Sequence, residues 1–401
     1  MKKVYIVAAK RTAIGSMLGT LKSVEATNLG AEVVKALLEE TKVKPEDISE
    51  VIVGNVLGAN LKQGPARQVA IKAGIPFEVP AYAINMVCGS AMKAVMNGYM
   101  AIRDGFDQIV IAGGIESMTR APYIVPGEVR DGVKMGNLTL FDHMLADGLH
   151  DSFSPIHMGV TAENIATKHS LTREEQDKFA YESQLKAIKA VDEGLFDEEI
   201  VPIVIKSRKG DIVFDKDEYP NRTTNLEKLA KLRPAFVKDG TVTAGNSSGI
   251  NDGAAFLMLV SEEALKKYKL TPLAEIVGVG QGGVDPNYMG LGPVPAIHDL
   301  FKRSGYKLKD MDVIELNEAF ASQSLGVIRE LSSEHGMSEK EILSKTNLQG
   351  GAIALGHPVG VSGARIIVTL LHIMKRHDYK LGLASLCIGG GMGTAVIIKK
   401  L

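Results

Sequence analysis

Hydrophobic positions follow two alternating patterns in the first part of the chain. Short apolar runs that favour buried strands occupy residues 4–9, 51–53 and 108–112. The segments between them, residues 29–41 and 91–103, carry apolar side chains at the spacing of a helix. This alternation is typical of chains whose helices cover a sheet. It predicts an α/β unit with a buried, largely parallel sheet over about the first 118 residues.

The pattern changes from Thr119 to about Asn246. This stretch consists of short segments rich in glycine, proline and charge, such as residues 125–132. One helix is expected to start near Thr172, because acidic residues follow in what would be its first turn. A structureless loop of this length is implausible in a compact domain. We therefore expect an inserted loop domain that has its own helices and forms part of a binding site.

The alternating α/β pattern returns after a turn-rich cluster at residues 245–253. Apolar runs again indicate strands, and one longer segment has helical spacing. The strands are expected at residues 255–260, 274–279, 312–316 and 383–386, and the helix at residues 362–375. The last third of the chain is therefore also predicted to be α/β.

The two α/β parts share one arrangement of residues. Cys88 precedes a segment with apolar residues at helical spacing, and a strand that ends at Gly113-Gly114 follows. His357 likewise precedes a helix, and a strand that ends at Gly389-Gly390 follows that helix. Two copies of one unit around a pseudo-twofold axis would turn these loops toward each other. The repeat therefore predicts that His357 lies close to Cys88.

Composition narrows the class of protein. The chain has 401 residues, more than one hydrophobic core usually serves, with 45% hydrophobic and 23% charged residues and no tryptophan. A net charge of −1 gives no reason to expect a nucleic-acid partner, and a small-molecule ligand is favoured. No apolar run approaches the ~18 residues of a membrane span. Only two cysteines are present, which fits a reducing compartment, and we expect a cytoplasmic protein.

Cys88 is the candidate nucleophile. It lies at the predicted start of a helix, where the dipole and unpaired amides favour thiolate over thiol, and Gly89 allows close approach of a ligand. An isolated cysteine is more often a buried structural residue. Here the glycine-rich segments around His357 and Cys387 favour a reactive thiol instead. The sequence thus predicts a reactive thiol at residue 88.

Three further residues complete the candidate chemistry. Pro358 holds His357 at a loop edge, where its imidazole can take the Cys88 proton or donate to an oxyanion. Cys387 precedes three glycines whose amides are free to bind an oxyanion, and its thiol can move a proton. Asn317 follows a predicted strand, where ligand-binding groups collect in α/β sheets. Together they predict acyl-thioester chemistry.

Other chemistries find no support in the sequence. Residues 278–283 match a dinucleotide fingerprint formally, but no apolar-periodic helix follows, so we reject that reading. The sequence contains no Walker A motif, no zinc-type cysteine and histidine spacing and no His-Glu-x-x-His. We therefore expect no metal site and no permanently bound cofactor.

Taken together, the sequence resembles the thiolase family over essentially its whole length. The resemblance rests on the motifs at residues 87–90, 113–118, 245–253, 317–320, 350–360 and 386–393. It implies a five-layered αβαβα sandwich of two similar halves with an inserted loop domain. The implied parts are a first half formed by residues 1–118 and about 247–270, a loop domain at 119–246 that serves the acyl channel and tetramerisation, and a second half at 271–401.

The resemblance also implies a mechanism. Cys88 would take an acetyl group from one acetyl-CoA with His357 as its base. Cys387 would then deprotonate a second acetyl-CoA, giving acetoacetyl-CoA and CoA. His357 and a water held by Asn317 would stabilise the enolate, and the amides of Cys88 and Gly389 would hold the tetrahedral oxyanion. The usual assembly is a homotetramer, and the substrates are coenzyme A thioesters.

By matching position, further residues are implied to bind the pantetheine and acyl groups of the substrate. They are Leu149, His157, Met158, Ala235, Phe236, Ala244, Ser248, Ala319 and Phe320. Met158 would close the pocket over a short acyl chain. Arg222 is assigned to the coenzyme A nucleotide, although Asn221 stands where many relatives have arginine.

Three alternatives stay open at this point. A degradative thiolase for longer 3-ketoacyl-CoA substrates would share every catalytic residue and differ in the shape of its pocket. A decarboxylating ketoacyl synthase generally has a second histidine where this chain has Cys387. An acyl-CoA-binding scaffold without activity would have no need for both cysteines, His357 and Asn317. The sequence also leaves open a regulatory disulfide between the two cysteines.

Overall fold

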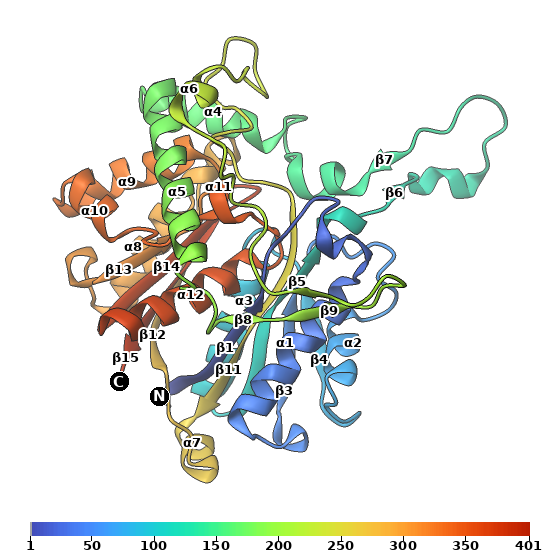
Figure 1. Ribbon diagram of the computed structural model, residues 1–401, viewed down its shortest axis with the longest axis vertical. Helices are drawn as coiled ribbons and strands as arrows, with labels where there is room; N and C mark the ends of the chain where they lie inside the picture. The colour runs from blue at the N-terminus through green and yellow to red at the C-terminus, as the bar shows by residue number, and fades with distance from the viewer. Residues whose placement is uncertain (1) are drawn as a thin grey trace.

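The computed structural model describes residues 2–401 and shows two α/β halves side by side (Figure 1). In the N-terminal half, the strands lie in the order β1-β11-β5-β3-β4. Their bounds are Val4–Thr12 for β1, Asn251–Ser261 for β11, Ile109–Ser117 for β5, Glu50–Gly54 for β3 and Ala81–Ile84 for β4. β11 thus returns from late in the chain to fill the place between β1 and β5.

The C-terminal half repeats this plan with four strands in the order β12-β15-β14-β13. They span Ala274–Gly283 for β12, Met392–Lys400 for β15, Leu381–Ile388 for β14 and Val313–Leu316 for β13. The sheets of the two halves meet only where β1 pairs with β12, through Tyr5 opposite Glu275 and Ile6 opposite Ala274. This seam is too short to hold the halves together alone, so the helices between the sheets must do so.

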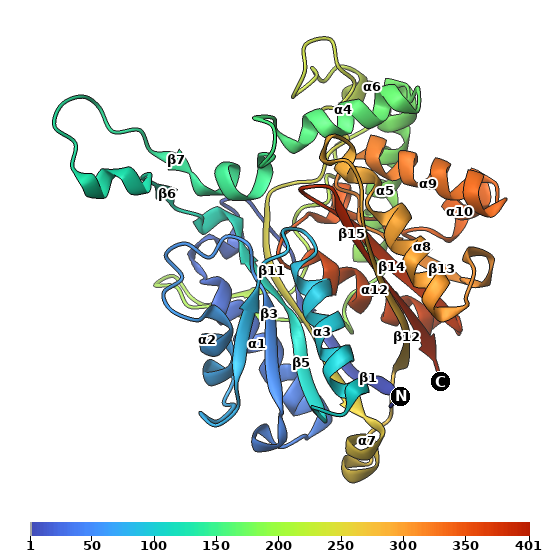
Figure 2. The same ribbon diagram turned by 180° about the vertical axis from the view of Figure 1, so that it is seen from behind.

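Helices form three layers around the two sheets (Figures 1 and 2). One outer layer packs on the N-terminal sheet, a middle layer fills the space between the sheets, and the other outer layer packs on the C-terminal sheet. These layers are, respectively, α1 (Ala26–Thr41) with α2 (Pro65–Lys72), α3 (Ser90–Asp104) with α12 (Ser362–His377), and α8 (Pro293–Ser304) with α9 (Ala321–His335). The predicted five-layered α/β sandwich is confirmed.

Each sheet is apolar on both faces, as burial between helix layers requires. In β3, Ile52 packs into the middle layer with α3, whereas Val51 and Val53 pack outward against α1 and α2. In β14, Leu386 faces the middle layer and Leu383 faces the outer layer. The continuous apolar runs found in the sequence therefore mark strands buried on both sides.

The expectation of a largely parallel sheet is wrong. β3 pairs in parallel with β4 and β5, and β13 with β14, but the pairings of β11 with β1 and β5 are antiparallel, as are those of β15 with β12 and β14. The cause is in the connections. Only the short Gly389-Gly390-Gly391 turn joins β14 to β15, and so short a turn allows only antiparallel pairing.

The segment between β5 and β11 carries its own helices and short strands. These are β6 (Tyr123–Ile124), β7 (Phe141–Asp142), α4 (Met158–Lys168), α5 (Arg173–Asp192), β8 (Ile200–Val201), β9 (Ile203–Ile205), β10 (Ile212–Phe214) and α6 (Leu226–Ala230). The helix expected near Thr172 is confirmed, because Thr172 caps α5 in a capping box with Glu175. Residues 121–144, here called the arm, project away from both halves (Figure 1).

The remaining strand and α-helices are short. They are β2 (Gly15–Ser16), α7 (Glu262–Tyr268), α10 (Glu339–Lys345) and the buried α11 (Ala352–Leu355). Among residues 2–401, no helix combines the length and the apolar character that crossing a membrane demands.

Candidate active site

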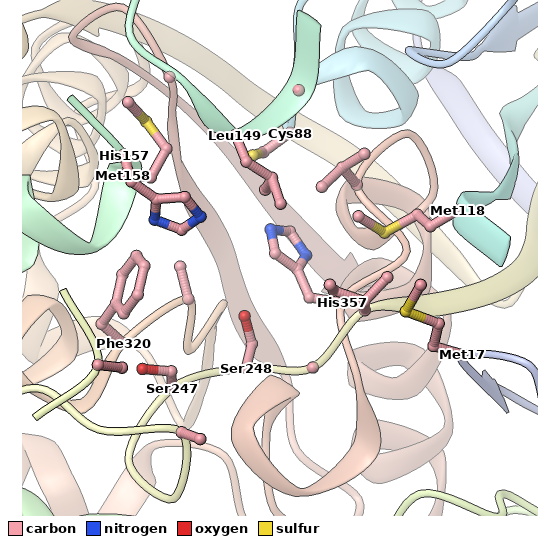
Figure 3. Close-up of a pocket in the computed structure, with 18 of the residues that line it drawn as sticks. Met17, Cys88, Met118, Leu149, His157, Met158, Ser247, Ser248, Phe320 and His357 are labelled. Atoms are coloured by element: carbon pink, nitrogen blue, oxygen red, sulfur yellow. The ribbon is translucent and has the colours of Figure 1, made fainter. Parts of the chain in front are cut away.

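A cavity of about 490 Å³ opens where the loops of the two halves meet the segment between β5 and β11. Figure 3 shows Cys88 and His357 reaching into it from opposite sides. Of the residues singled out in the sequence, thirteen line it: Cys88, Leu149, His157, Met158, Ala235, Phe236, Ala244, Ser248, Ala319, Phe320, His357, Cys387 and Gly389. The fold therefore collects in one place side chains that are far apart in the chain.

A strained turn presents Cys88 to the cavity. The preceding Val87 has a φ of 45°, a left-handed conformation that costs a β-branched residue of order 1–3 kcal/mol. Ser90 holds the turn, because its hydroxyl donates to the Val87 carbonyl at 2.6 Å and accepts the Met86 N–H at 2.9 Å. Helix α3 then begins at Ser90, two residues later than the nucleophile.

The prediction that Cys88 favours the thiolate is wrong for the resting protein. Burial raises the pKa of Cys88 to about 11, although hydrogen bonds from the backbone of Gly389 and of Cys88 itself lower it. The helix dipole acts mainly within the first turn, and Cys88 lies outside it. The thiol is therefore protonated at neutral pH and requires a base to become a nucleophile.

His357 is held by a fixed set of hydrogen bonds. Its backbone N–H donates to Asn251 Oδ1 at 2.9 Å, and its Nδ1 lies 2.6 Å from Ser362 Oγ. The Ser362 hydroxyl donates to the Pro358 carbonyl at 3.1 Å, so its oxygen is left to accept a proton from Nδ1. This assignment places the hydrogen on Nδ1 and leaves Nε2 free to accept a proton.

The His357 imidazole is neutral in its resting state. Burial, together with the positive charge of Arg365, lowers the pKa of His357 to about 4. Asn317 does not line the cavity, but its Nδ2 lies 3.5 Å from His357 Nδ1, and its Oδ1 is buried without a hydrogen-bond partner. A neutral imidazole with a free Nε2 can accept the proton of Cys88.

Cys387 lies at the end of β14, opposite Gly393 of β15. Burial raises the pKa of its thiol, and the neighbouring Cys88 raises it further. The turn that follows contains Gly390 and Gly391, both with a φ of 83°, which favours glycine at these positions. Both cysteines are free thiols.

Aromatic and apolar side chains form the wall opposite His357. The His157 ring stacks on Phe236 at 4.7 Å between centroids, and Phe236 packs edge-to-face on Phe320 at 6.0 Å. Met158 packs with these rings and with Cys387 in one apolar cluster. A narrow apolar wall of this kind fits a thin acyl chain, not a charged group.

Arg222 lies outside the cavity lining. Its guanidinium forms two hydrogen bonds to Asp192, at 2.9 and 2.6 Å, on the surface. Its assignment to the coenzyme A nucleotide therefore stays a prediction.

Sequence reasoning missed several residues of the site. Ser362 and Asn251 orient His357, and other residues that were given no role line the cavity: Ser16, Met17, Met118, Gly148, Tyr219, Ser247, Gly249, Ile250, Met289 and Val359. Asn251 and Met118 lie inside motifs already noted at 245–253 and 113–118. A signal for them existed, but a motif alone does not say which side chain faces the cavity.

Comparison with known proteins covers the whole chain. The thiolase N-terminal domain matches residues 4–263, and the thiolase C-terminal domain matches residues 270–400. An acetyl-CoA acetyltransferase of Chromobacterium violaceum is 53% identical over 399 residues, which are 99% of this chain and 100% of that protein.

Two solved structures are similar over their full length. The acetyl-CoA acetyltransferase of Syntrophomonas wolfei has a TM-score of 0.97 at 43% identity, with 100% of both chains covered. Human mitochondrial 3-ketoacyl-CoA thiolase has a TM-score of 0.94 at 46% identity, covering 100% of this chain and 99% of that chain.

A thiol, an imidazole with a free nitrogen and a second thiol lie around one apolar cavity, and with these matches they define an acyltransferase. The family follows from the same residues and from the matches. The chain belongs to the thiolase family, and the resemblance noted in the sequence is confirmed.

Proposed function

We propose that this thiolase is an acetyl-CoA acetyltransferase, which condenses two molecules of acetyl-CoA to acetoacetyl-CoA and CoA through an acetyl group on Cys88. The observation that carries the proposal is the shared cavity of Cys88, His357 and Cys387. The printed names of the Chromobacterium and Syntrophomonas relatives support it.

The first half-reaction moves the acetyl group to the enzyme. His357 Nε2 takes the proton of Cys88 as the sulfur attacks the thioester carbonyl. The carbon–sulfur bond to coenzyme A breaks, and the departing thiolate receives the proton from His357. The N–H groups of Cys88 and Gly389, which face the Cys88 sulfur, are placed to bind the oxyanion that forms there.

The second half-reaction makes the carbon–carbon bond. His357 Nε2, free again after the first half-reaction, takes the proton of Cys387. The Cys387 thiolate then removes an α-proton from a second acetyl-CoA, and the carbanion attacks the acetyl carbonyl on Cys88. The Cys88 sulfur leaves and takes the proton held by His357, so both thiols and the neutral imidazole are restored. Because burial raises the pKa of Cys387, its thiolate is a stronger base than an ordinary one, which the weakly acidic α-carbon requires.

The enolate oxygen also needs stabilisation. Asn317 lies beside His357 and has a buried, unpaired Oδ1, so its amide has spare hydrogen-bonding capacity to hold a water. That water and His357 would together donate to the enolate. This arrangement supports the role inferred for Asn317.

A second candidate is a thiolase that cleaves longer 3-ketoacyl-CoA substrates. The similarity to human mitochondrial 3-ketoacyl-CoA thiolase favours it, since that protein shares 46% identity. The crowded wall of Met158, Phe236 and Phe320 favours short chains instead. Steady-state thiolysis of four-carbon and eight-carbon 3-ketoacyl-CoA separates the two, and we expect clear preference for the shorter substrate.

We also propose that the protein is a homotetramer in the cytoplasm. The arm exposes large apolar side chains, among them Met135 at 95% and Tyr123 at 67%. At the edge of the N-terminal sheet, β4 has one unpaired side, and Tyr82 and Ala83 on it are exposed. The apolar arm and the unpaired edge of β4 are two separate surfaces that suit an assembly with two kinds of interface.

The proposed reaction has a direct test. The protein is mixed with acetyl-CoA, and intact-mass and peptide spectra are searched for an acetyl adduct, about 42 Da, on Cys88. The same measurement is made on Cys387→Ser, together with formation of acetoacetyl-CoA. We expect acetylation in both proteins and condensation only in the wild type. Condensation by Cys387→Ser would contradict the role of Cys387 as base.

A further inference from the structure

Glu116, near the end of β5, is a buried carboxylate outside the cavity lining. Its side chain has 0% exposure. One oxygen, Oε1, accepts the Leu57 N–H at 3.1 Å and the Asn55 amide at 2.9 Å. The other, Oε2, accepts the Val56 N–H at 3.0 Å and the Gly360 N–H at 3.0 Å. Four donors and no acceptor surround it, which suits an ionised carboxylate.

These donors belong to two different loops. Asn55, Val56 and Leu57 follow β3 in the N-terminal half, whereas Gly360 belongs to the loop that carries His357 in the C-terminal half. One carboxylate thus links the halves at the point where the catalytic groups meet. The link crosses from one half to the other far from the short seam between β1 and β12.

The loop after β3 also reaches the nucleophile. Asn85 Nδ2 lies 3.4 Å from the Val56 carbonyl, and Asn85 Oδ1 accepts the Val87 N–H at 2.9 Å, next to Cys88. Val56 and Leu57 pack with Val359, and Cys88 packs against the same cluster. Glu116 therefore holds two loops. The loop after β3 contacts the turn that places the Cys88 thiol, and the Gly360 loop carries the His357 imidazole.

The fit around Gly360 leaves no room for adjustment. A Cβ at Gly360 would lie 2.5 Å from Glu116 Oε2, and a Cβ at Gly114 would lie 2.1 Å from the Gly360 carbonyl oxygen. Both glycines allow the His357 loop to lie directly against β5. The carboxylate and the two glycines form one close contact between the halves.

The charge state of Glu116 is balanced between opposing effects. Burial raises the pKa of Glu116 and the N–H donors of Val56, Leu57 and Gly360 lower it, while Asp252 on β11 adds a smaller increase. The balance is a pKa of about 7. Asp252 is itself a buried carboxyl whose pKa is raised by burial. Removing the N–H donors or the charge of Glu116 would therefore change the positions of the loops that its carboxylate holds.

We propose that Glu116 is a positioning residue that sets the distance between His357 and Cys88 by holding the Gly360 N–H and the loop after β3 at the same carboxylate. It touches no substrate. Its effect is on the transfer of the Cys88 proton, because a misplacement of about 1 Å at a reacting centre lowers rates by about 100-fold. The inference rests on the proposed acetylation of Cys88.

The test is the isosteric variant Glu116→Gln. Its amide keeps one acceptor oxygen and presents an NH₂ group to two of the four donors, so either Gly360 and Val56 or Asn55 and Leu57 lose their acceptor. We expect kcat and the single-turnover rate of Cys88 acetylation to fall about 10- to 100-fold, while KM for acetyl-CoA changes less than about threefold. The residues that line the acyl channel are untouched, which is why binding is spared.

A second variant changes Gly360, the other partner in the contact with Glu116. Gly360→Ala pushes the His357 loop away from an intact carboxylate. We expect the same split between kcat and KM, and a double variant no worse than the poorer single one, because both changes break one link. This non-additivity would not arise from two unrelated losses of stability.

Asp312→Asn is the matched control. Like Glu116, Asp312 accepts backbone amides and lies outside the cavity lining, but its two partners, the N–H groups of Lys380 and Leu381 at 2.8 and 3.0 Å, belong to neither the Cys88 turn nor the His357 loop. We expect this variant to lower thermal stability slightly and to leave kcat and acetylation unchanged. An equal loss of kcat in Asp312→Asn would overturn the inference.

All rates are measured well below each protein's unfolding temperature and are normalised to folded protein by near-UV circular dichroism. If wild type fails to acetylate, the proposed function is at fault. If wild type acetylates and Glu116→Gln does so equally fast, or if its loss matches its unfolded fraction, the positioning role is refuted while the function stands.

Discussion

At the scale of single residues, the resting site is uncharged. Burial places the pKa of Cys88 at about 11 and that of His357 at about 4, so thiol and imidazole are both neutral at physiological pH. The residue types and their roles follow from sequence motifs. The protonation states do not, because they depend on how many apolar groups surround each side chain, and these come from every part of the chain.

The pH dependence of Cys88 reactivity follows from this state. Well below a pKa, the thiolate fraction rises about tenfold per pH unit. We expect alkylation of Cys88 by iodoacetamide, followed by peptide mass spectrometry without substrate, to accelerate steadily from about pH 7 to about pH 10. A rate already at its plateau near neutral pH would reveal a thiolate–imidazolium pair and contradict the neutral site.

Ser362 fixes which nitrogen of His357 carries the hydrogen. Ser362→Ala removes the acceptor at 2.6 Å from Nδ1 and frees the ring to adopt the other tautomer. Loss of one hydrogen bond of about 0.5–1.5 kcal/mol predicts a fall in kcat of roughly 2- to 10-fold, with KM nearly unchanged. Steady-state kinetics measures both parameters.

Thr346→Val serves as the control for that substitution. Its hydroxyl is also buried and donates to the Ile342 carbonyl at 2.7 Å at the end of α10, and Thr346 does not line the cavity. We expect some loss of stability and no change in kcat. If the two variants behave alike, the hydroxyl of Ser362 has no special part in orienting His357.

At the scale of elements, the site depends on two loops that pack directly on each other. A Cβ at Gly89 would lie 2.3 Å from Ile388 Cδ1 and 3.3 Å from the Met86 carbonyl oxygen. The Cys88 turn therefore packs so closely on the end of β14 that a side chain at residue 89 would displace Ile388 or the turn itself. Sequence reasoning placed both loops correctly at helix and strand ends, but it gave no register between them.

Gly89→Ala tests this packing. Overpacking in a filled site costs about 1–3 kcal/mol, and here it would separate the Cys88 turn from Cys387. We expect a loss of Cys88 acetylation of about 100-fold at most, by displacement of the sulfur. Adding Ile388→Val removes the clashing methyl group, so the double variant should recover part of the rate in the same single-turnover assay. No recovery would locate the defect elsewhere in the turn.

The strands themselves were largely predictable, but their directions were not. Residues 4–9, 108–112 and 383–386 were recognised as strands from their apolar runs, and the structure extends each of them by a few residues. The sequence pattern of β11 is the same whether its neighbours run with or against it. Direction is set by where the chain returns to the sheet, which local hydrophobicity does not encode.

At the scale of the whole molecule, the halves were foreseen from the repeated glycine-rich loops, and the projecting arm was not. The arm exposes Met135, Leu138 and Leu140 to solvent in the single chain, at 95%, 56% and 59%. Exposed apolar side chains of this size on a projecting segment support the proposed homotetramer, with the arm at an interface between chains.

The arm therefore has a testable role in assembly. The double variant Met135→Asp and Leu138→Asp places charges in the proposed interface, and we expect the mass by light scattering to fall to roughly half that of the wild type, as when a tetramer separates into dimers. Val204→Asp, at an apolar position 52% exposed outside the arm, is the control and should leave the mass unchanged. An unchanged mass in the double variant would exclude the arm from the interface.

The position of β11 bears on how the protein is made. While the ribosome is still translating residues before Asn251, β1 and β5 have already emerged, yet the strand that lies between them does not exist. The edges of β1 and β5 that pair with β11 therefore stay unpaired in the nascent N-terminal half until β11 leaves the exit tunnel. Chaperones that shield strand edges would have their main task during that interval, and a translational pause shortly before residue 251 would prolong it.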